Sequence, residues 1–383
     1  MGALKARVYA LSIPFKMTFA HARASRSACD SLILEIDDGT FRGYGEAILR
    51  EYVNGPEARS TDLQSIAEGL KKVLEAVIQS ASGVVDGEVL RRAVLHLPWK
   101  KGELPLVSAV ESAFLDLLCR REKKDVYELL GIEPLRQELV YGGVVPLLPG
   151  KAAAMMVQRY LQHDIQYLRL KLSESLEQNR QLLSVVRGVT GPGFDVRVDV
   201  NCGWDLDTAA AHLDLLDEYR IRLVEEPLEP DREAMLELGR RAKGRDIAFV
   251  ADESAVTFQD VEGIIADGSF SMLNIRLAKN GGILRSLAIA DMADTAGLQY
   301  QLGAHVGETG ISSITGRITA SLMKSPVYID GSFDEYILSD NITTRSFSFG
   351  VGGKASIVRS EGIGYETSPA KLEMYAHAVA PVL

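Results

Sequence analysis

The chain has 383 residues, 46% of them hydrophobic, and a formal net charge of −10 at neutral pH. This size and composition predict a globular protein with room for a barrel and a second domain. Because the chain is acidic and has no basic run, its composition argues against a general nucleic-acid partner, whereas a small anionic substrate beside local cations remains compatible with it.

The cysteines and the N-terminal residues argue against several further features, namely disulfides, a zinc site, a secretory signal and a membrane span. Cys29, Cys119 and Cys202 are odd in number and form no CxxC pair, so neither disulfides nor a zinc site are predicted. The first residues lack the pattern of a secretory signal, and no apolar run reaches membrane length. We therefore expect a cytoplasmic protein without a membrane partner.

The chain begins with strand patterns. Apolar and polar residues alternate at 3–13 and 31–37, and the Asp37-Asp38-Gly39 sequence predicts a hairpin turn to a partner strand at 41–46. Between the first two strands, residues 19–26 are polar and cationic, and we expect them to form a loop.

Helical patterns follow these strands. Residues 61–80 and 107–130 place their apolar side chains at helical spacing. Strands followed by helices predict a separate α+β domain over residues 1–133. The Gly-rich and then polar tail at 345–383 is expected to pack back on this domain.

From about residue 138, strand-like runs alternate with amphipathic segments. The predicted strands are residues 139–145, 167–172, 195–200, 222–226, 248–252, 272–277, 298–302 and 327–330. Helical spacing is found at residues 174–188, 207–219, 231–243 and 283–296. Eight strands that alternate with helices predict a (β/α) barrel, which we assign to residues 134–344.

Three consecutive barrel strands end in acids. Asp199, Glu225 and Asp252 follow one another at intervals of 26 and 27 residues, the length of one barrel unit. Their carboxylates are therefore expected side by side at one end of the barrel. Like charges so close are costly unless a cation lies among them, and hard oxygen ligands suit Mg²⁺. A single such acid is more often a helix cap, but three in register predict a metal site.

The chain resembles the enolase superfamily, and within it the mandelate racemase/muconate-lactonizing branch. The resemblance covers nearly the whole chain. It rests on short motifs in matching order: Asp37-Asp38-Gly39, Gly43-Tyr44-Gly45-Glu46, residues 109–118, Leu130-Gly131, Arg169-Leu170-Lys171, Asp199-Val200-Asn201, Glu225-Glu226-Pro227, Asp252-Glu253-Ser254 and Lys279-Asn280-Gly281-Gly282.

The resemblance implies a modified (β/α)7β TIM-type barrel with an N-terminal α+β capping domain. It also implies that Asp199, Glu225 and Asp252 bind Mg²⁺, for which Mn²⁺ can substitute, together with a substrate carboxylate. Members of the superfamily remove the proton next to that carboxylate. A divalent cation and nearby cationic side chains stabilise the negative charge that develops.

The strand at 167–172 carries the predicted base. Arg169 and Lys171 are two residues apart and point to the same side of this strand. In the family this strand usually reads Lys-x-Lys, and its second lysine is the acid/base, so Lys171 is implied in that role. The fork of Arg169 suits a carboxylate oxygen. Outside a barrel, the same pair would indicate a solvated strand edge.

The sequence departs from the family pattern on the sixth strand. Lysine-using members carry their second catalytic lysine at the position that Arg276 holds here, and a guanidinium is a poor proton acceptor. His305, after the seventh strand, matches the catalytic histidine of the mandelate racemase type. An arginine beside it would lower its pKa and keep it neutral. A structural, hydrogen-bonded histidine is an equal alternative, and Lys279 belongs to a supporting turn.

Further residues are predicted at the substrate. Dipeptide epimerases carry Asp-x-Asp on the eighth strand, and only Asp330 matches here, which weakens a dipeptide substrate. The other candidates are Asn201 after the third strand, Lys279 in the turn after the sixth strand, Glu308 near His305, and His21, Arg23 and Tyr52 in the capping domain. A solvated loop is an equal alternative for the residues around His21.

We expect a Mg²⁺-dependent racemase or epimerase of a small carboxylic acid that forms a homo-oligomer. Lys171 and His305 would act on opposite faces of the substrate. The alternative is a lyase or cycloisomerase, such as an acid-sugar dehydratase or an enzyme similar to o-succinylbenzoate synthase or muconate-lactonizing enzyme. In that case Lys171 is the single acid/base and Arg276 is a fixed cation. A binding protein without turnover is a third class.

Overall fold

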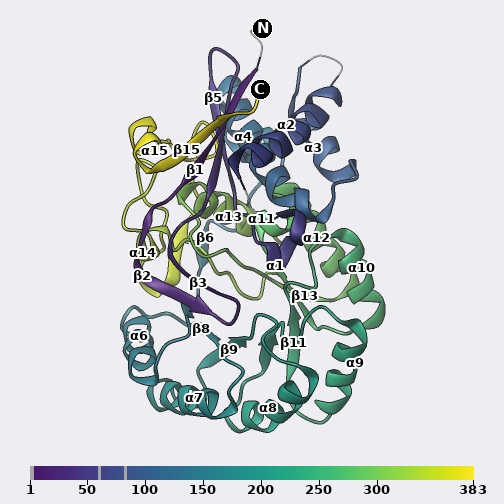
Figure 1. The fold of residues 1–383 in the computed structure, drawn as a ribbon, viewed down its shortest axis with the longest axis vertical. Coiled ribbons are helices and arrows are strands. Elements are labelled where there is room, and N and C mark those ends of the chain that lie inside the picture. Colours follow the sequence, from purple (N-terminus) through teal and green to yellow (C-terminus); the bar gives the residue numbers. More distant parts are fainter. Residues whose placement is uncertain (1–3, 59–61, 82–83) are drawn as a thin grey trace.

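The computed structural model describes residues 4–58, 62–81 and 84–383. A capping sheet with its helices lies against a curled parallel sheet that is surrounded by helices (Figure 1). The expected barrel with an N-terminal α+β cap is confirmed. The first residues of the predicted segments 3–13 and 61–80 lie outside the described residues. Within those residues, no helix is long and apolar enough to cross a bilayer.

The capping sheet has four strands in the order β15-β1-β4-β5, and every neighbouring pair is antiparallel. The strands are β1 (Lys5–Leu11), β4 (Leu32–Asp37), β5 (Arg42–Ala47) and β15 (Ala376–Pro381). β15 belongs to the C-terminal tail, which also contains α15 (Pro369–Tyr375), so the tail pairs with the first strand of the chain. The domain boundary at residue 133 stays a prediction.

Among the described residues, five α-helices follow the first strands of the cap: α1 (Glu51–Asn54), α2 (Leu63–Gln79), α3 (Gly87–His96), α4 (Leu104–Glu122) and α5 (Val126–Leu130). The prediction of one helix over 107–130 was wrong. The helix ends at Lys123, which has a φ of 54°, and a new one begins after the capping side chain of Asp125.

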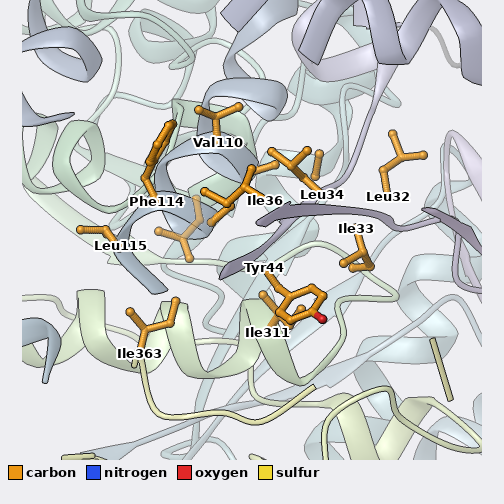
Figure 2. Packing of buried hydrophobic residues seen from close by; sticks show 14 of the residues in the cluster. Leu32, Ile33, Leu34, Ile36, Tyr44, Val110, Phe114, Leu115, Ile311 and Ile363 are labelled. Atoms are coloured by element: carbon orange, nitrogen blue, oxygen red, sulfur yellow. The ribbon is translucent and has the colours of Figure 1, made fainter. Parts of the chain in front are cut away.

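Helix α4 lies directly on β5. An ideal Cβ atom on Gly43 would be 2.1 Å from the Ala113 carbonyl oxygen, and one on Gly45 would be 1.9 Å from the Ala109 carbonyl oxygen. Only glycine therefore permits this approach of the two backbones. In Figure 2, Leu34 and Ile36 of β4 lie on the same side of their strand as Val110 and Phe114 of α4, and all four belong to one buried cluster.

The barrel sheet has seven parallel strands in sequence order: β7 (Gly143–Val145), β8 (Tyr167–Lys171), β9 (Asp195–Asp199), β10 (Leu223–Glu225), β11 (Ala248–Ala251), β12 (Met272–Ile275) and β13 (Gln299–Leu302). Their side chains are almost entirely buried, as expected for parallel strands covered by helices. The strands predicted between residues 167 and 302 are thereby confirmed.

The first and the last predicted barrel strands need correction. Residues 139–145 form two strands: β6 (Glu138–Val140), which pairs with β14 (Lys354–Ser356), and β7 in the barrel. Residues 327–330 form an extended segment instead of a regular strand. This segment closes the barrel through backbone hydrogen bonds from Leu302 to Tyr328 (3.0 Å) and from Gly142 to Ile329 (3.0 Å).

Seven helices surround this sheet: α6 (Gly150–Gln162), α7 (Leu176–Thr190), α8 (Leu206–Glu218), α9 (Arg232–Arg241), α10 (Phe258–Asp267), α12 (Ile283–Ala296) and α13 (Gly310–Leu322). The helices predicted at 174–188, 207–219, 231–243 and 283–296 are confirmed. Several begin at a residue whose side chain accepts a first-turn N–H group, for example Ser175, Asp205 and Asp231.

The polar loop predicted at 19–26 is part of a hairpin of β2 (Pro14–His21) and β3 (Ala24–Ala28). The hairpin extends from the cap toward the barrel strands (Figure 1). There, the carbonyl oxygen of Ala20 accepts a hydrogen bond from Leu147 N–H at 2.9 Å. Glu46 of β5 also joins the two parts, since its carboxylate accepts the backbone N–H groups of Thr309 and Ser312.

Candidate active site

The three predicted acids lie at the carboxyl ends of adjacent strands. Asp199 and Glu225 end β9 and β10 and are paired in register, and Asp252 follows β11 directly. All three are at most 1% exposed. They are neighbours because parallel strands bring their carboxyl ends to the same edge of the sheet.

Cationic side chains hold two of these acids. Lys171 Nζ donates to Asp199 Oδ2 at 2.5 Å and to Asn201 Oδ1 at 2.8 Å. Arg169, two residues earlier on β8, donates to Glu225 Oε1 at 2.8 Å and approaches Asp199 to 3.5 Å. Arg169 and Lys171 therefore face the same interior, as their spacing predicts.

The third acid is held by residues that follow β12. Arg276 donates to Asp252 Oδ2 and lies 3.3 Å from Glu225 Oε1. Lys279, in the short helix α11 (Leu277–Asn280), donates to Asp252 Oδ1 at 3.0 Å. Lys279 is fully buried and also donates to two backbone carbonyl groups, so it fixes the end of this strand.

The donor set fits a hard divalent cation, because three buried carboxylates on one edge are ligands that Mg²⁺ prefers. In the described part of the chain, however, no three acidic, histidine or cysteine side chains are arranged closely enough to hold an ion as they lie. Arg276 bridges Asp252 and Glu225. A metal ion bound by all three acids therefore requires this guanidinium to move.

The pKa values of the acids reflect this mixture of burial and charge. Burial, followed by the charge of Glu225, raises the pKa of Asp199 to about 6. Burial by itself would also raise the pKa of Glu225, but the guanidinium groups of Arg169 and Arg276 outweigh it and hold that pKa well below its usual range. Glu225 is therefore ionised, and the cations beside it are the reason.

A cavity opens above these strand ends, between the barrel and the capping hairpin. The space that the centre of a water molecule can reach in it is about 130 Å³. Its polar walls are formed by His21, Arg26, Arg50, Tyr52, Arg169, Lys171, Asn201, Arg276 and His305. The structure thus brings together most of the side chains predicted at the substrate, from both the cap and the barrel.

His305 reaches the cavity from the loop after β13. Its Nε2 atom is buried and has no hydrogen-bond partner within the described residues, while its backbone N–H donates to Glu308 at 2.7 Å. Burial, and then the positive charges of Arg276 and Arg50, lower the pKa of His305 well below its usual range. The imidazole is therefore neutral at pH 7.

The capping residues differ in their placement. His21 lines the cavity near Tyr52, whose hydroxyl group lies 3.5 Å from His21 Nε2. Burial, and then Lys171, lower the pKa of His21 to about 3, so it is neutral as well. Arg23 lies outside the cavity wall and pairs with Glu229 of the barrel.

Three predicted substrate residues, Asp330, Glu308 and Lys279, are also absent from the described wall of this cavity. Asp330 is 2% exposed and is held by Arg197 at 2.5 Å and by Arg169 at 3.2 Å. Burial raises the pKa of Glu308 to about 8. These positions match the family pattern in sequence, but their side chains are engaged elsewhere.

Sequence reasoning missed the apolar half of the cavity. Its wall is formed by Met17, Phe19, Val144, Pro146, Met156, Tyr160, Ala304, Val306, Phe333, Tyr336 and Ile337. These residues come from β2, β7, α6, the loop after β13 and the region of α14 (Asp334–Ile337). No local pattern distinguishes them from ordinary core residues. Arg50 was missed as well, because it belongs to none of the motifs that identified the other polar residues.

Comparisons with known proteins agree with this architecture. An L-amino acid-D/L-Glu epimerase from Francisella philomiragia is 28% identical over 301 residues, which are 76% of this chain and 80% of that protein. The solved N-succinyl Arg/Lys racemase from Bacillus cereus has a TM-score of 0.84 at 20% identity and covers both chains completely.

A dipeptide epimerase from Cytophaga hutchinsonii, solved with Mg and the dipeptide D-Ala-L-Val, has a TM-score of 0.82 at 19% identity over 99% of both chains. Matched relatives also include chloromuconate cycloisomerases. The predicted class, an enzyme of the racemase, epimerase or cycloisomerase kind, is thereby confirmed. A family model described as enolase C-terminal domain-like matches residues 151–371, more than half of the chain. The chain therefore belongs to the enolase C-terminal domain-like family.

Proposed function

We propose that the protein is a Mg²⁺-dependent racemase or epimerase that removes and returns the proton next to the carboxylate of a small acid. The observation that supports this function best is the convergence of Lys171 and His305 on one cavity. Four strands separate β8 from β13 in the curled sheet, so the two side chains approach a bound acid from different sides.

Lys171 is the proposed base for one face of the substrate. Asp199 and Asn201 hold its Nζ atom and fix the direction from which it meets the α-carbon. Arg169 and Arg276 place two permanent positive charges beside the substrate carboxylate, where negative charge develops as the proton leaves. Mg²⁺ held by Asp199, Glu225 and Asp252 would supply further positive charge at that carboxylate.

His305 is the proposed acid/base for the other face. Its neutral imidazole can accept a proton, and the cations around it make the protonated form a ready donor. Nε2 has no hydrogen-bond partner in the described protein and is assigned to this transfer. The tautomer that leaves Nε2 free to accept a proton carries its own proton on Nδ1.

A lyase or cycloisomerase is the second candidate. It is favoured by Arg276, which occupies the position of the second catalytic lysine and is already paired with two acids. In that reaction Lys171 alone would transfer the proton. Arg276 would serve as a fixed positive charge.

The test is α-proton exchange in D₂O, measured by NMR with Mg²⁺ and a library of acids. Lys171→Ala is expected to abolish exchange, and Lys151→Ala, on the exposed surface of α6, is the matched control. Exchange with a product of unchanged composition identifies a racemase, whereas loss of water or ring closure identifies the second candidate. Exchange at the wild-type rate in Lys171→Ala would contradict the proposed base.

The proposal also covers the metal ion, the substrate class, the cellular location and the oligomeric state. Mg²⁺, with Mn²⁺ as a substitute, is supported by the three buried carboxylates and by the relatives solved with Mg. A small carboxylic acid as substrate is supported by the cationic cavity wall. The cytoplasmic location and the homo-oligomer stay predictions.

A further inference from the structure

The charged wall of the cavity has a single sign. Five charged side chains line it, all of them cationic: Arg26, Arg50, Arg169, Lys171 and Arg276. None of the described lining residues is Asp or Glu, and the two lining histidines are neutral at pH 7. The wall therefore attracts an anionic group and offers no counter-ion to an ammonium group.

Apart from the three proposed metal ligands, which Lys171, Arg169 and Arg276 already hold, three other acids near the cavity are engaged elsewhere. The carboxylate of Asp330 forms ion pairs with Arg197 and Arg169. Asp330 lines a separate, smaller pocket. Glu308 is directed to the backbone N–H of His305. The carboxylate of Asp30 is bound by both terminal nitrogens of Arg50, each at 2.9 Å. A substrate ammonium would thus face cations without a partner, at a large cost in desolvation.

The rest of the wall is apolar. Its apolar lining residues include Phe19 of the hairpin, Met156 and Tyr160 of α6, and Phe333 and Ile337 beside α14. The cations come mainly from β8 and from the end of β12. The cavity therefore offers cations to a carboxylate and apolar side chains to a hydrocarbon group.

We propose that the substrate is a carboxylic acid with a bulky apolar group and without a free ammonium group, such as an N-acylated apolar amino acid. This inference rests on the proposed function, which supplies the reacting carboxylate. It separates this chain from relatives named for dipeptides, although those are among its most similar proteins. The withheld carboxylate of Asp330 is the physical reason for the difference.

The test compares N-propionyl-L-phenylalanine with L-alanyl-L-phenylalanine, two acids that differ only by the ammonium group. Binding to the Mg²⁺-loaded protein is measured by calorimetry, and α-proton exchange is measured in parallel. We expect the propionyl acid to bind at least 100-fold more tightly. N-propionylglycine, which lacks the apolar side chain, should bind at least tenfold more weakly than N-propionyl-L-phenylalanine.

Two neighbouring residues of α6 provide a matched pair of variants. Met156 lines the cavity, whereas Met155 is 51% exposed on the outside of the same helix. Met156→Asp should weaken binding of N-propionyl-L-phenylalanine at least tenfold, while Met155→Asp should leave it unchanged. Equal effects of the two substitutions would overturn the apolar subsite.

Failure of this inference is distinguishable from failure of the proposed function. If the dipeptide binds as tightly as the propionyl acid and exchanges its α-proton, the substrate class is wrong and the proposed chemistry stands. If no acid in the whole library exchanges its α-proton, the proposed chemistry is wrong, and the substrate class fails with it.

Discussion

Replacing His305 by Asn decides between the two candidate reactions. Nε2 of His305 has no hydrogen-bond partner in the described protein, and the backbone contact with Glu308 is kept by any side chain, so the fold should survive. If His305 returns the proton, its loss should lower kcat by about 10² to 10⁴, the usual contribution of an acid/base group. This range corresponds to about 3 to 5 kcal/mol in the activation barrier.

The assay follows each enantiomer of the substrate separately in D₂O. In His305→Asn, Lys171 should still exchange the α-proton of one enantiomer, while inversion and exchange of the other should be lost. His163→Asn, at an exposed position after α6, is the control. An effect of less than about threefold, far below an acid/base contribution, would refute the two-base reaction and favour elimination or cyclisation by one lysine.

Three further predictions concern metal affinity, packing and pH. Arg276→Lys should bind Mn²⁺ more tightly than the wild type, by about tenfold or 1.4 kcal/mol, because a single ammonium cannot bridge two acids as the guanidinium does. Mn²⁺ affinity is measured by titration followed by electron paramagnetic resonance, and equal affinities of the variant and the wild type would contradict this prediction. Gly45→Ala should destabilise the fold by about 1 to 3 kcal/mol or more, measured by urea unfolding, since its Cβ would overlap the Ala109 carbonyl oxygen; an unchanged midpoint would show that α4 can move aside. Burial raises the pKa of Glu111 to about 8, above its unfolded value of about 4.3. Between these two pH values, the carboxyl group of Glu111 is therefore protonated in the folded state and ionised in the unfolded state. The stability that this proton contributes is complete below about pH 4 and falls as the pH rises to about 8, and Glu111→Gln should flatten this decline in unfolding experiments at pH 5 to 8.

The barrel strands from β8 to β13 and the order of the three acids could be predicted from the sequence. A buried parallel strand is a short apolar run, and its carboxyl end is set by the chain direction, so Asp199, Glu225 and Asp252 were assigned to one edge by their spacing alone. The pair Arg169 and Lys171 shares one side of β8 for the same local reason.

Local patterns failed where the partner of a segment lies far away in the chain. Residues 19–26, in the hairpin β2–β3, were predicted as a loop. The contacts that hold them against the barrel, such as Leu147 N–H with the Ala20 carbonyl oxygen, come from a distant part of the chain. Residues 139–145 were predicted as one strand, but their two ends pair with different sheets. Such pairings depend on segments that are distant in sequence.

The sequence by itself determined the family, the barrel and the set of chemically active side chains, since these follow from local periodicity and motif order. Only the tertiary structure decided which of them share a cavity. Asp330 matched a motif, yet Arg197 and Arg169 hold it away from the cavity, whereas Met156 matched none and lines it. The physical reason is that a cavity wall and an ion pair are made by side chains from different elements, and no stretch of sequence contains both partners.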